Sequence, residues 1–430
     1  MTAADALDRT LLLMRDHVQD SVSDTELLDA LTGVEVALVA DRPNVSVQEA
    51  QHALIAAATL CARSGACCYL EAPNVPLQGV HAPLYGERLC EGLADLGADL
   101  IPDVRFRDGV PAHEIDVALV MGDSPWRGRA RHVIRLSGGP WVGCISPAGE
   151  RWNATGLPFG ALAAAGLAAG ESFKTAMRRL RASAADPAGF EQYFAPVASA
   201  QVELAPAGAP RPTLRLDRFD VVSGGAICHA ALYALARVPG LSASVRVIEP
   251  KTSDSPDLNR YSLLRRSRLG VRKVDDLASQ PLGGLQITGI PLKYDDSTRE
   301  VIDPLAPFVL VGVDDIPSRW IVQRARPAWL GVGATSHYSA MASFHSSGLA
   351  CAICLHPRAD DDPRPIPTVA FVSHWAGLWL ASLLVRCAAG QAPPRNQQQA
   401  YLTMLRPDSA GALWQSGVAA RVGCPMHCPL

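Results

Sequence analysis

Short apolar segments alternate with helical patterns along most of the chain, and this alternation restricts its fold more than any other feature. Strands joined by helices in this way favour a parallel sheet covered by helices, so an α/β fold is predicted. In the first half, the strands are expected at 36–39, 67–70, around Leu100 and at 116–121, with helices at 47–64 and 88–96.

The second half repeats this scheme, and each half closes with an apolar helix rich in small residues. We therefore predict an internal duplication. Two unrelated α/β domains would also show such alternation, because periodicity alone does not specify topology. In the second half the strands are expected at 218–222, 245–248, 285–290 and 308–313, with a helix at 226–236; the closing helices are expected at 158–177 and 373–389.

A proline-rich stretch at 205–212, Ala-Pro-Ala-Gly-Ala-Pro-Arg-Pro, separates the two halves. It can form neither a helix nor a central strand, so it predicts a linker. The predicted domains are 1–204 and 213–430, and 430 residues are enough for about two or three cores.

Composition excludes several classes of protein. The net charge is −3 and no basic stripe runs through the chain, which argues against a nucleic-acid partner. No uninterrupted apolar stretch of about 18 residues is present, so no membrane span is expected. The acidic N-terminus lacks a signal-peptide core. The eleven cysteines are therefore expected to be reduced thiols in a cytoplasmic protein.

Four cysteines form two close pairs near the end of the chain. Cys351 and Cys354 are the first pair; Cys424 and Cys428 are the second, with His427 between them. Two such pairs can close one tetrahedral zinc site that ties the C-terminal extension to the domain. Either Cys428 or His427 could be the fourth ligand, and the alternative is a set of incidental thiols.

Small residues follow the first strand of the second half. A loop of this kind can aim backbone N–H groups and a helix N-terminus at phosphate, which predicts nucleotide contacts at Ser223 and Gly225. Glu249 ends the next strand, where an acid can accept hydrogen bonds from ribose hydroxyls. Each signal is weak by itself, since turns need glycine and strands often end in solvated acids.

Three further charged residues follow in order. Arg260, which comes after Asn259, and Lys273 can neutralise phosphate oxygens, the arginine by a two-pronged contact and the lysine as a point charge. Asp314 follows a buried strand, and a carboxylate there can hold Mg²⁺ together with phosphate oxygens.

The order of these residues resembles the adenylating domain shared by ThiF, MoeB and the ubiquitin-activating enzymes, which also carry a paired-cysteine zinc site. The resemblance implies two Rossmann-like doubly wound domains, the second active. The first lacks the glycine loop, having Ala-Asp-Arg-Pro-Asn at 40–44, and resembles an inactive adenylation domain. An arginine of its N-terminal helix, Arg9 or Arg15, would then reach the shared site.

This resemblance also implies a function. The chain would use ATP and Mg²⁺ to adenylate the C-terminal carboxylate of a ubiquitin-like protein, with a conjugating enzyme as a further partner and neither nucleic acid nor membrane involved. Arg260, Lys273 and Asp314 would be catalytic, and Ser223, Gly225, Glu249 and Asn259 would bind the nucleotide. The segment 356–372 has no cysteine, so a thioester step stays open.

Three alternatives remain at this point. The activated partner could be a sulfur carrier or the peptide precursor of a natural product. The chain could be a zinc-stabilised scaffold that has lost nucleotide binding, although the retained Arg260, Lys273 and Asp314 argue against that. A dehydrogenase is the third, but it would need neither Lys273, Asp314 nor the zinc pairs.

Overall fold

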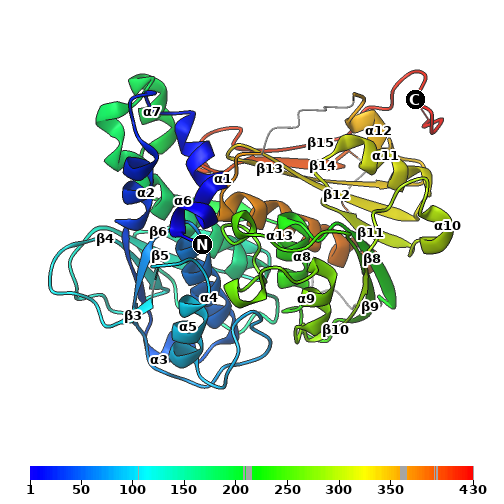
Figure 1. Ribbon diagram of the computed structural model, residues 1–430. Helices are drawn as coiled ribbons and strands as arrows, with labels where there is room; N and C mark the ends of the chain where they lie inside the picture. Colours follow the sequence, from blue (N-terminus) through cyan, green and yellow to red (C-terminus); the bar gives the residue numbers. More distant parts are fainter. Residues whose placement is uncertain are drawn as a thin grey trace.

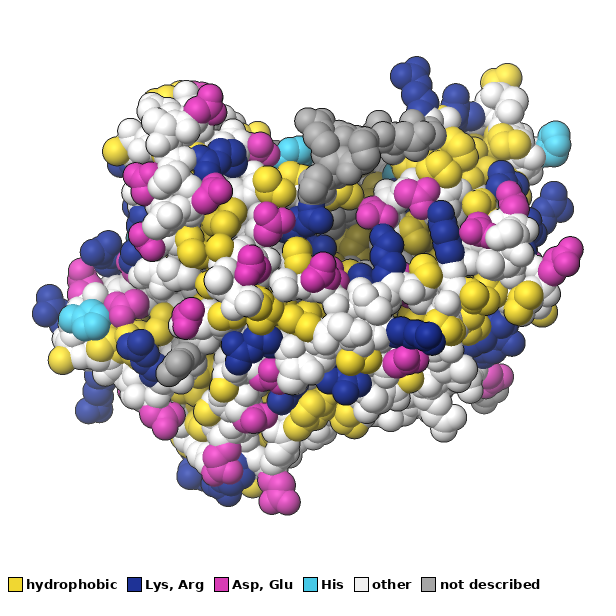
Figure 2. Space-filling model, in the orientation of Figure 1, with side chains coloured by type: hydrophobic (Ala, Val, Ile, Leu, Met, Phe, Trp, Pro, Cys, Tyr) yellow, Lys and Arg dark blue, Asp and Glu magenta, His cyan; other side chains and the backbone are white. Residues whose placement is uncertain are grey.

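Two α/β halves lie side by side in the computed structural model (Figure 1). The structure describes residues 1–104, 106–206, 209, 216–358, 366–391, 393 and 396–429. On the face shown in Figure 2, basic and acidic side chains are interspersed, and neither sign forms a continuous field.

The first sheet has seven strands in the order β3-β2-β1-β4-β5-β6-β7. Its first five strands are parallel, and β6 and β7 continue it antiparallel. Its central strand β4 is buried along its whole length, as expected for a parallel strand covered on both faces. The strands are β1 (Glu35–Val39), β2 (Cys67–Glu71), β3 (Phe106–Asp108), β4 (Ile115–Met121), β5 (Ala130–Gly138), β6 (Val142–Ser146) and β7 (Ala200–Glu203).

The second sheet has the order β10-β9-β8-β11-β12-β13-β14-β15. Here too five parallel strands are extended by antiparallel ones. Apart from β15, the two halves have the same strand order and directions, which is what a duplication would produce. The strands are β8 (Arg218–Val222), β9 (Ser242–Ile248), β10 (Gly284–Ile290), β11 (Phe308–Val311), β12 (Trp329–Ser336), β13 (Ser339–Ser346), β14 (Gln399–Thr403) and β15 (Leu413–Ser416).

Helices complete both halves, and the predicted fold of two Rossmann-like domains is confirmed. The α-helices are α1 (Ala3–Arg15), α2 (Asp24–Thr32), α3 (Arg42–Val45), α4 (Gln48–Arg63), α5 (Leu89–Ala98), α6 (Phe159–Arg179), α7 (Pro187–Phe194), α8 (Ala226–Leu235), α9 (Lys273–Ser279), α10 (Arg299–Ile302), α11 (Ile316–Arg324), α12 (Ala352–Leu355) and α13 (Ala370–Ala388). Short 3₁₀ turns occur at η1 (Arg181–Ser183), η2 (Ser255–Asp257) and η3 (Arg266–Arg268).

The two small-residue helices, α6 and α13, pack against each other where the halves meet. Their backbones approach closely because α6 offers glycine: a Cβ on Gly166 would lie 2.6 Å from the Trp375 indole nitrogen. The ring of His374 also bonds the Leu162 carbonyl oxygen at 3.0 Å. One hydrophobic cluster consequently includes residues of both halves.

Within the described residues, α13 is the one helix long and apolar enough to cross a membrane. However, 94% of its apolar window is buried inside the fold. That burial is typical of a core helix, because a membrane span would present its apolar face to lipid.

Two sequence expectations need correction. No strand forms around Leu100; the third strand is β3, six residues further on, because Leu100 and Ile101 are buried in the turn that follows α5. The strand predicted at 308–313 ends at Val311. Of the linker predicted at 205–212, residues 207, 208 and 210–212 lie outside the described residues.

Candidate functional site

The loop between β8 and α8 has a strained backbone at its first residue. The backbone of Ser223 has a φ angle of +118°, a conformation that residues other than glycine rarely adopt. It is held by two bonds: its N–H donates to the Ile248 carbonyl oxygen at 3.1 Å, and its Oγ accepts from Gly225 N–H at 2.9 Å. The loop therefore turns sharply at the end of β8 and starts α8 at Ala226.

Glu249 folds back onto this loop from the end of β9. Its carboxylate accepts from Gly224 N–H at 2.9 Å and from Lys251 N–H at 3.0 Å. The close approach requires glycine, because a Cβ on Gly224 would lie 2.9 Å from Glu249 Cγ and 3.0 Å from Lys273 Cβ. The loop, the acid and the lysine thus form one cluster.

The 250–272 segment leaves β9 and returns beside it, which explains how Lys273 reaches Glu249. Lys273 N–H donates to the Lys251 carbonyl oxygen at 3.0 Å, and Ser253 N–H donates to the Val271 carbonyl oxygen at 2.9 Å. Lys273 is then the first residue of α9. Glu249 and Lys273, which are 24 positions apart in the sequence, thereby lie together at the end of β9.

A buried carboxylate, Asp257, links the two predicted cations. It lies 3.2 Å from the Arg260 guanidinium and 3.3 Å from Lys273 Nζ. Lys273 Nζ also donates to the Tyr261 hydroxyl oxygen at 2.8 Å. Burial, followed by the charge of Asp257, raises the pKa of Tyr261 well above its usual value, so this phenol stays protonated. Asp257 is not among the residues predicted from the sequence; its position three residues before Arg260 is the one signal that the sequence offers for it.

Asn259 contacts other parts of the chain. It is fully buried, and its amide nitrogen donates to Thr10 Oγ1 on α1 at 2.9 Å and to the Thr368 carbonyl oxygen at 3.4 Å. Its oxygen accepts from Arg260 at 3.0 Å. In this structure Asn259 therefore connects the first half to the loop that carries Arg260.

Of the two N-terminal arginines, only Arg9 lies near this cluster. Burial lowers the pKa of Arg9, and the neighbouring Arg260 lowers it further. Two of its nitrogens, Nε and one terminal nitrogen, are buried without a hydrogen-bond partner in the part of the chain that is described. Arg15 instead pairs with Asp24. Arg9 thus adds a third cation to this cluster, beside Arg260.

Asp314 follows β11, at the same edge of the sheet as the glycine loop. A Cβ on Gly225 would lie 3.8 Å from the Gly312 carbonyl oxygen, two residues before Asp314. The neighbouring Asp315 caps α11 by accepting from Ser318 N–H at 3.0 Å. Among the described residues, Asp314 accepts only from Asp315 N–H, at 3.1 Å, and it is exposed, so its carboxylate remains available to a cation.

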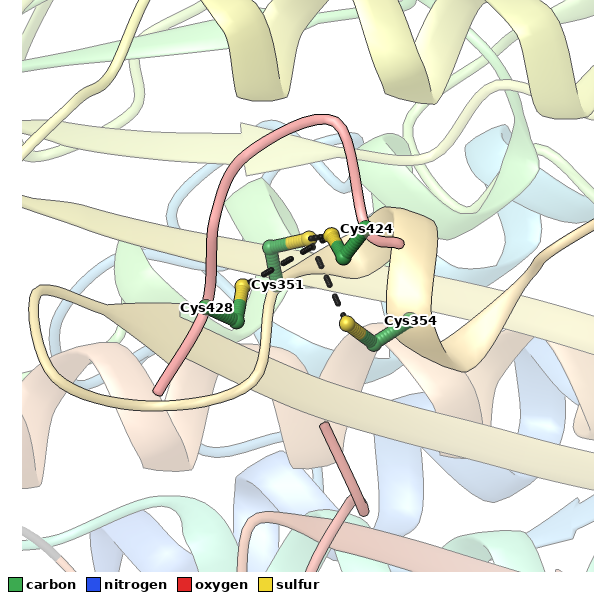
Figure 3. A group of neighbouring side chains, drawn as sticks. All are labelled: Cys351, Cys354, Cys424 and Cys428. Atoms are coloured by element: carbon green, nitrogen blue, oxygen red, sulfur yellow. Dashed lines mark hydrogen bonds between the residues drawn. The ribbon is translucent and has the colours of Figure 1, made fainter. Parts of the chain in front are cut away.

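The four paired cysteines come together in a separate cluster (Figure 3). Their sulfur atoms all lie within 4.8 Å of one another, and the pairs of thiols joined by hydrogen bonds have sulfur atoms 3.4 to 3.8 Å apart. A tetrahedral zinc with Zn–S of about 2.3 Å has sulfur atoms about 3.8 Å apart, so these residues fit the ion. The cluster contains Cys428 and not His427.

Burial opposes the ionisation of Cys424. Hydrogen bonds from Met426 N–H and the neighbouring thiols outweigh it and lower the pKa of Cys424 to about 7. A thiolate is the form that binds a metal ion. The lowered pKa of Cys424 therefore suits a metal ligand, whereas burial raises the pKa of Cys351 and of Cys428, so those two thiols would lose their protons as the metal binds.

The chain has only low sequence identity to known proteins, and the matches cover about half of it or less. No family model matches the chain. A curated protein of Sinorhizobium fredii, uncharacterized protein y4jF, is 29% identical over 205 residues, which are 46% of this chain and 39% of that protein. The chain thus spans well under half the length of this relative.

Among solved structures, E. coli MccB with MccA-N7isoASN is 16% identical and covers 49% of this chain and 66% of its own, with a TM-score of 0.41. PaaA is 13% identical, covering 47% of this chain and 73% of its own, with a TM-score of 0.37.

Proposed function

We propose that this protein binds Mg·ATP at the carboxyl ends of β8, β9 and β11 and adenylates a C-terminal carboxylate. The observation that carries the proposal is the convergence of the strained Ser223 loop, Glu249 and Lys273 at one strand edge, with Arg260 joined to them through Asp257. Parallel sheets bind nucleotides at this edge, outside the strand ends.

In the proposed reaction, a carboxylate oxygen of the partner attacks the α-phosphorus of ATP, and the bond to pyrophosphate breaks. Negative charge then grows on the leaving pyrophosphate. Arg260 and Lys273 would stabilise that charge, and they are already fixed by Asp257 and Tyr261, so little reorganisation is needed. Glu249 would accept from the ribose, and Ser223 and Gly225 would approach the phosphates.

Mg²⁺ would be held by Asp314 and by phosphate oxygens, where it neutralises charge on the phosphates. Arg9 would approach the same phosphates from α1. Two of its buried nitrogens make no hydrogen bond in the described part of the chain, and the nearest carboxylate to Nε is Asp8 at 3.9 Å; this supports the role, because buried donors without an acceptor are costly unless a ligand satisfies them.

The proposed partner is a ubiquitin-like protein that enters with its C-terminal tail, in a cytoplasmic conjugation system with a conjugating enzyme. A sulfur carrier or a peptide precursor presents the same terminal carboxylate and is the alternative within this chemistry. The test is exchange of labelled pyrophosphate into ATP, measured with each type of partner. Exchange with none of them would contradict adenylation.

Asp314→Ala is expected to abolish Mg²⁺-dependent exchange while the melting temperature stays within about 2 °C. The exposed side chain contributes little to the core, whereas loss of a metal ligand removes charge stabilisation from the phosphates. Exchange is measured over a Mg²⁺ titration. Asp296→Ala is the matched control, because Asp296 is an exposed acid in the loop after β10. Equal Mg²⁺ dependence in both variants would place the metal elsewhere.

A second candidate function is a zinc-stabilised scaffold without catalysis. Two observations favour it: Asp257 already neutralises part of the charge of Arg260 and Lys273, and Glu249 already occupies the Gly224 amide. A bound triphosphate would have to compete with both carboxylates.

Asp257→Asn separates the two candidates. If the site binds ATP, removal of the competing anion should tighten binding about 3- to 10-fold, because the two cations then face only the triphosphate. Asp275→Asn, on the exposed part of α9, is the control. Calorimetry that detects no ATP binding in either the wild type or Asp257→Asn would support the scaffold.

A further inference from the structure

We infer that the metal cluster and the Asp314 loop are mechanically coupled through two residues, Arg319 and His356, so that metal binding positions the proposed Mg²⁺ ligand. This inference rests on the proposed function for its catalytic consequence. The coupling itself concerns only contacts within the chain.

The first link joins the cysteine cluster to His356. Cys351 is the N-cap of the short helix α12, Cys354 lies within that helix, and His356 directly follows it. His356 N–H donates to the Ala352 carbonyl oxygen at 2.9 Å. A metal bound by both cysteines would therefore fix α12, and with it the position of the His356 ring.

The second link joins His356 to Arg319 on α11. A terminal nitrogen of Arg319 lies 3.1 Å from His356 Nε2, and because a guanidinium can only donate, Nε2 accepts. The backbone of His356 is held as well, since Trp320 Nε1 donates to its carbonyl oxygen at 2.8 Å. Trp320 itself packs against the cysteine cluster.

The third link joins Arg319 to the strand end. Its Nε and its other terminal nitrogen both donate to the Val313 carbonyl oxygen, at 3.2 and 2.9 Å. Val313 directly precedes Asp314. Arg319 is only 6% exposed, so solvent does not compete for these bonds. The planar guanidinium thus joins the residue before Asp314 to the residue after the metal-binding helix.

This arrangement explains why Arg319 is buried without a direct carboxylate partner. No ion pair within 4.0 Å involves it in the described part of the chain, and Asp314 and Asp315 act on it only over longer distances. Its guanidinium instead donates hydrogen bonds to the Val313 carbonyl oxygen and to the His356 ring. Arg319 and His356 are therefore positioning residues, and we assign them no contact with a substrate.

Hydrogen exchange of the segment 312–320 tests the coupling without any nucleotide. His356→Ala should raise its exchange rate at least about 10-fold while one metal ion per chain is retained, because the arginine loses its acceptor on the metal side. His356→Gln should restore protection, since an amide oxygen can replace Nε2 as the acceptor. His337→Ala is the control, an exposed histidine that pairs with Asp16.

Removal of the metal by chelation should raise exchange in the same segment, and chelation of His356→Ala should add little more. Unchanged exchange at 312–320 in His356→Ala, with the metal still bound, would overturn the coupling. The Mg²⁺ concentration for half-maximal pyrophosphate exchange should also rise in His356→Ala, with less effect on the maximal rate. If no pyrophosphate exchange exists, the proposed function fails, and the hydrogen-exchange result still decides the coupling.

Discussion

Lys273→Ala is expected to lower pyrophosphate exchange at least about 100-fold, as the loss of one transition-state charge contact often does. Lys273 Nζ is held by Tyr261 and Asp257, so its charge is fixed before the reaction begins. Among the described residues, the variant also leaves Arg260 as the one cation within 4.0 Å of Asp257, which would further reduce the positive charge offered to the phosphates. The measurement is the initial rate of label transfer at saturating ATP.

Lys293→Ala provides the matched control for Lys273→Ala, because Lys293 is an exposed lysine in the same half. Lys273→Arg keeps the charge in a larger side chain and should recover part of the rate. Circular dichroism must show that all three variants are folded. Equal exchange rates in Lys273→Ala and Lys293→Ala would remove the proposed phosphate site.

Cys351→Ser is expected to release one zinc per chain and to lower the melting temperature by roughly 5 °C or more. The ion would join α12 to a tail 73 positions further along the chain, so its loss frees two distant segments together. Elemental analysis after gel filtration measures the metal, and differential scanning calorimetry measures the stability.

Cys144→Ser is the control for this prediction, since Cys144 lies on β6 of the other half and is only partly buried. Comparison of Cys428→Ser with His427→Ala tests the fourth ligand, and the geometry predicts metal loss only in the former. Protein purified without metal and with wild-type stability would contradict the zinc assignment.

The sequence predicted the fold because its signals were local and repeated. Apolar runs such as the one that forms β4 are long enough to identify buried strands, and the matching order in both halves supports a common topology. The strand expected around Leu100 was wrong because buried leucines also occur in turns. The short strand β3 contains only one partly buried apolar residue, Phe106, and gave no such signal.

Within the site, sequence order placed the charged residues but could not reveal their partners. Asp257, Arg9 and His356 gain their importance from tertiary contacts: Asp257 with Lys273, Arg9 with Arg260, and His356 with Arg319. Asn259 illustrates the converse. Its place in the motif predicted a nucleotide contact, whereas its amide bonds to α1 across the two halves. The proposed nucleotide role of the motif remains a prediction.

The first half offers a contrasting cavity at its own strand ends. This cavity of 790 Å³ is lined by Asp41, Glu71, Glu91 and Asp108, among other residues, and the described residues that line it include no lysine or arginine. Four carboxylates would repel a triphosphate, so we expect no nucleotide there. The asymmetry between the halves is therefore electrostatic as well as a matter of the missing glycine loop.

Calorimetric titration of Mg·ATP into the wild-type protein and into Lys273→Ala tests whether the second half binds ATP, and it needs no knowledge of the partner. We expect one ATP per chain in the wild type and binding weakened at least about 10-fold in the variant. Two ATP per chain, equal affinity in both proteins, or no binding to the wild type would contradict this expectation.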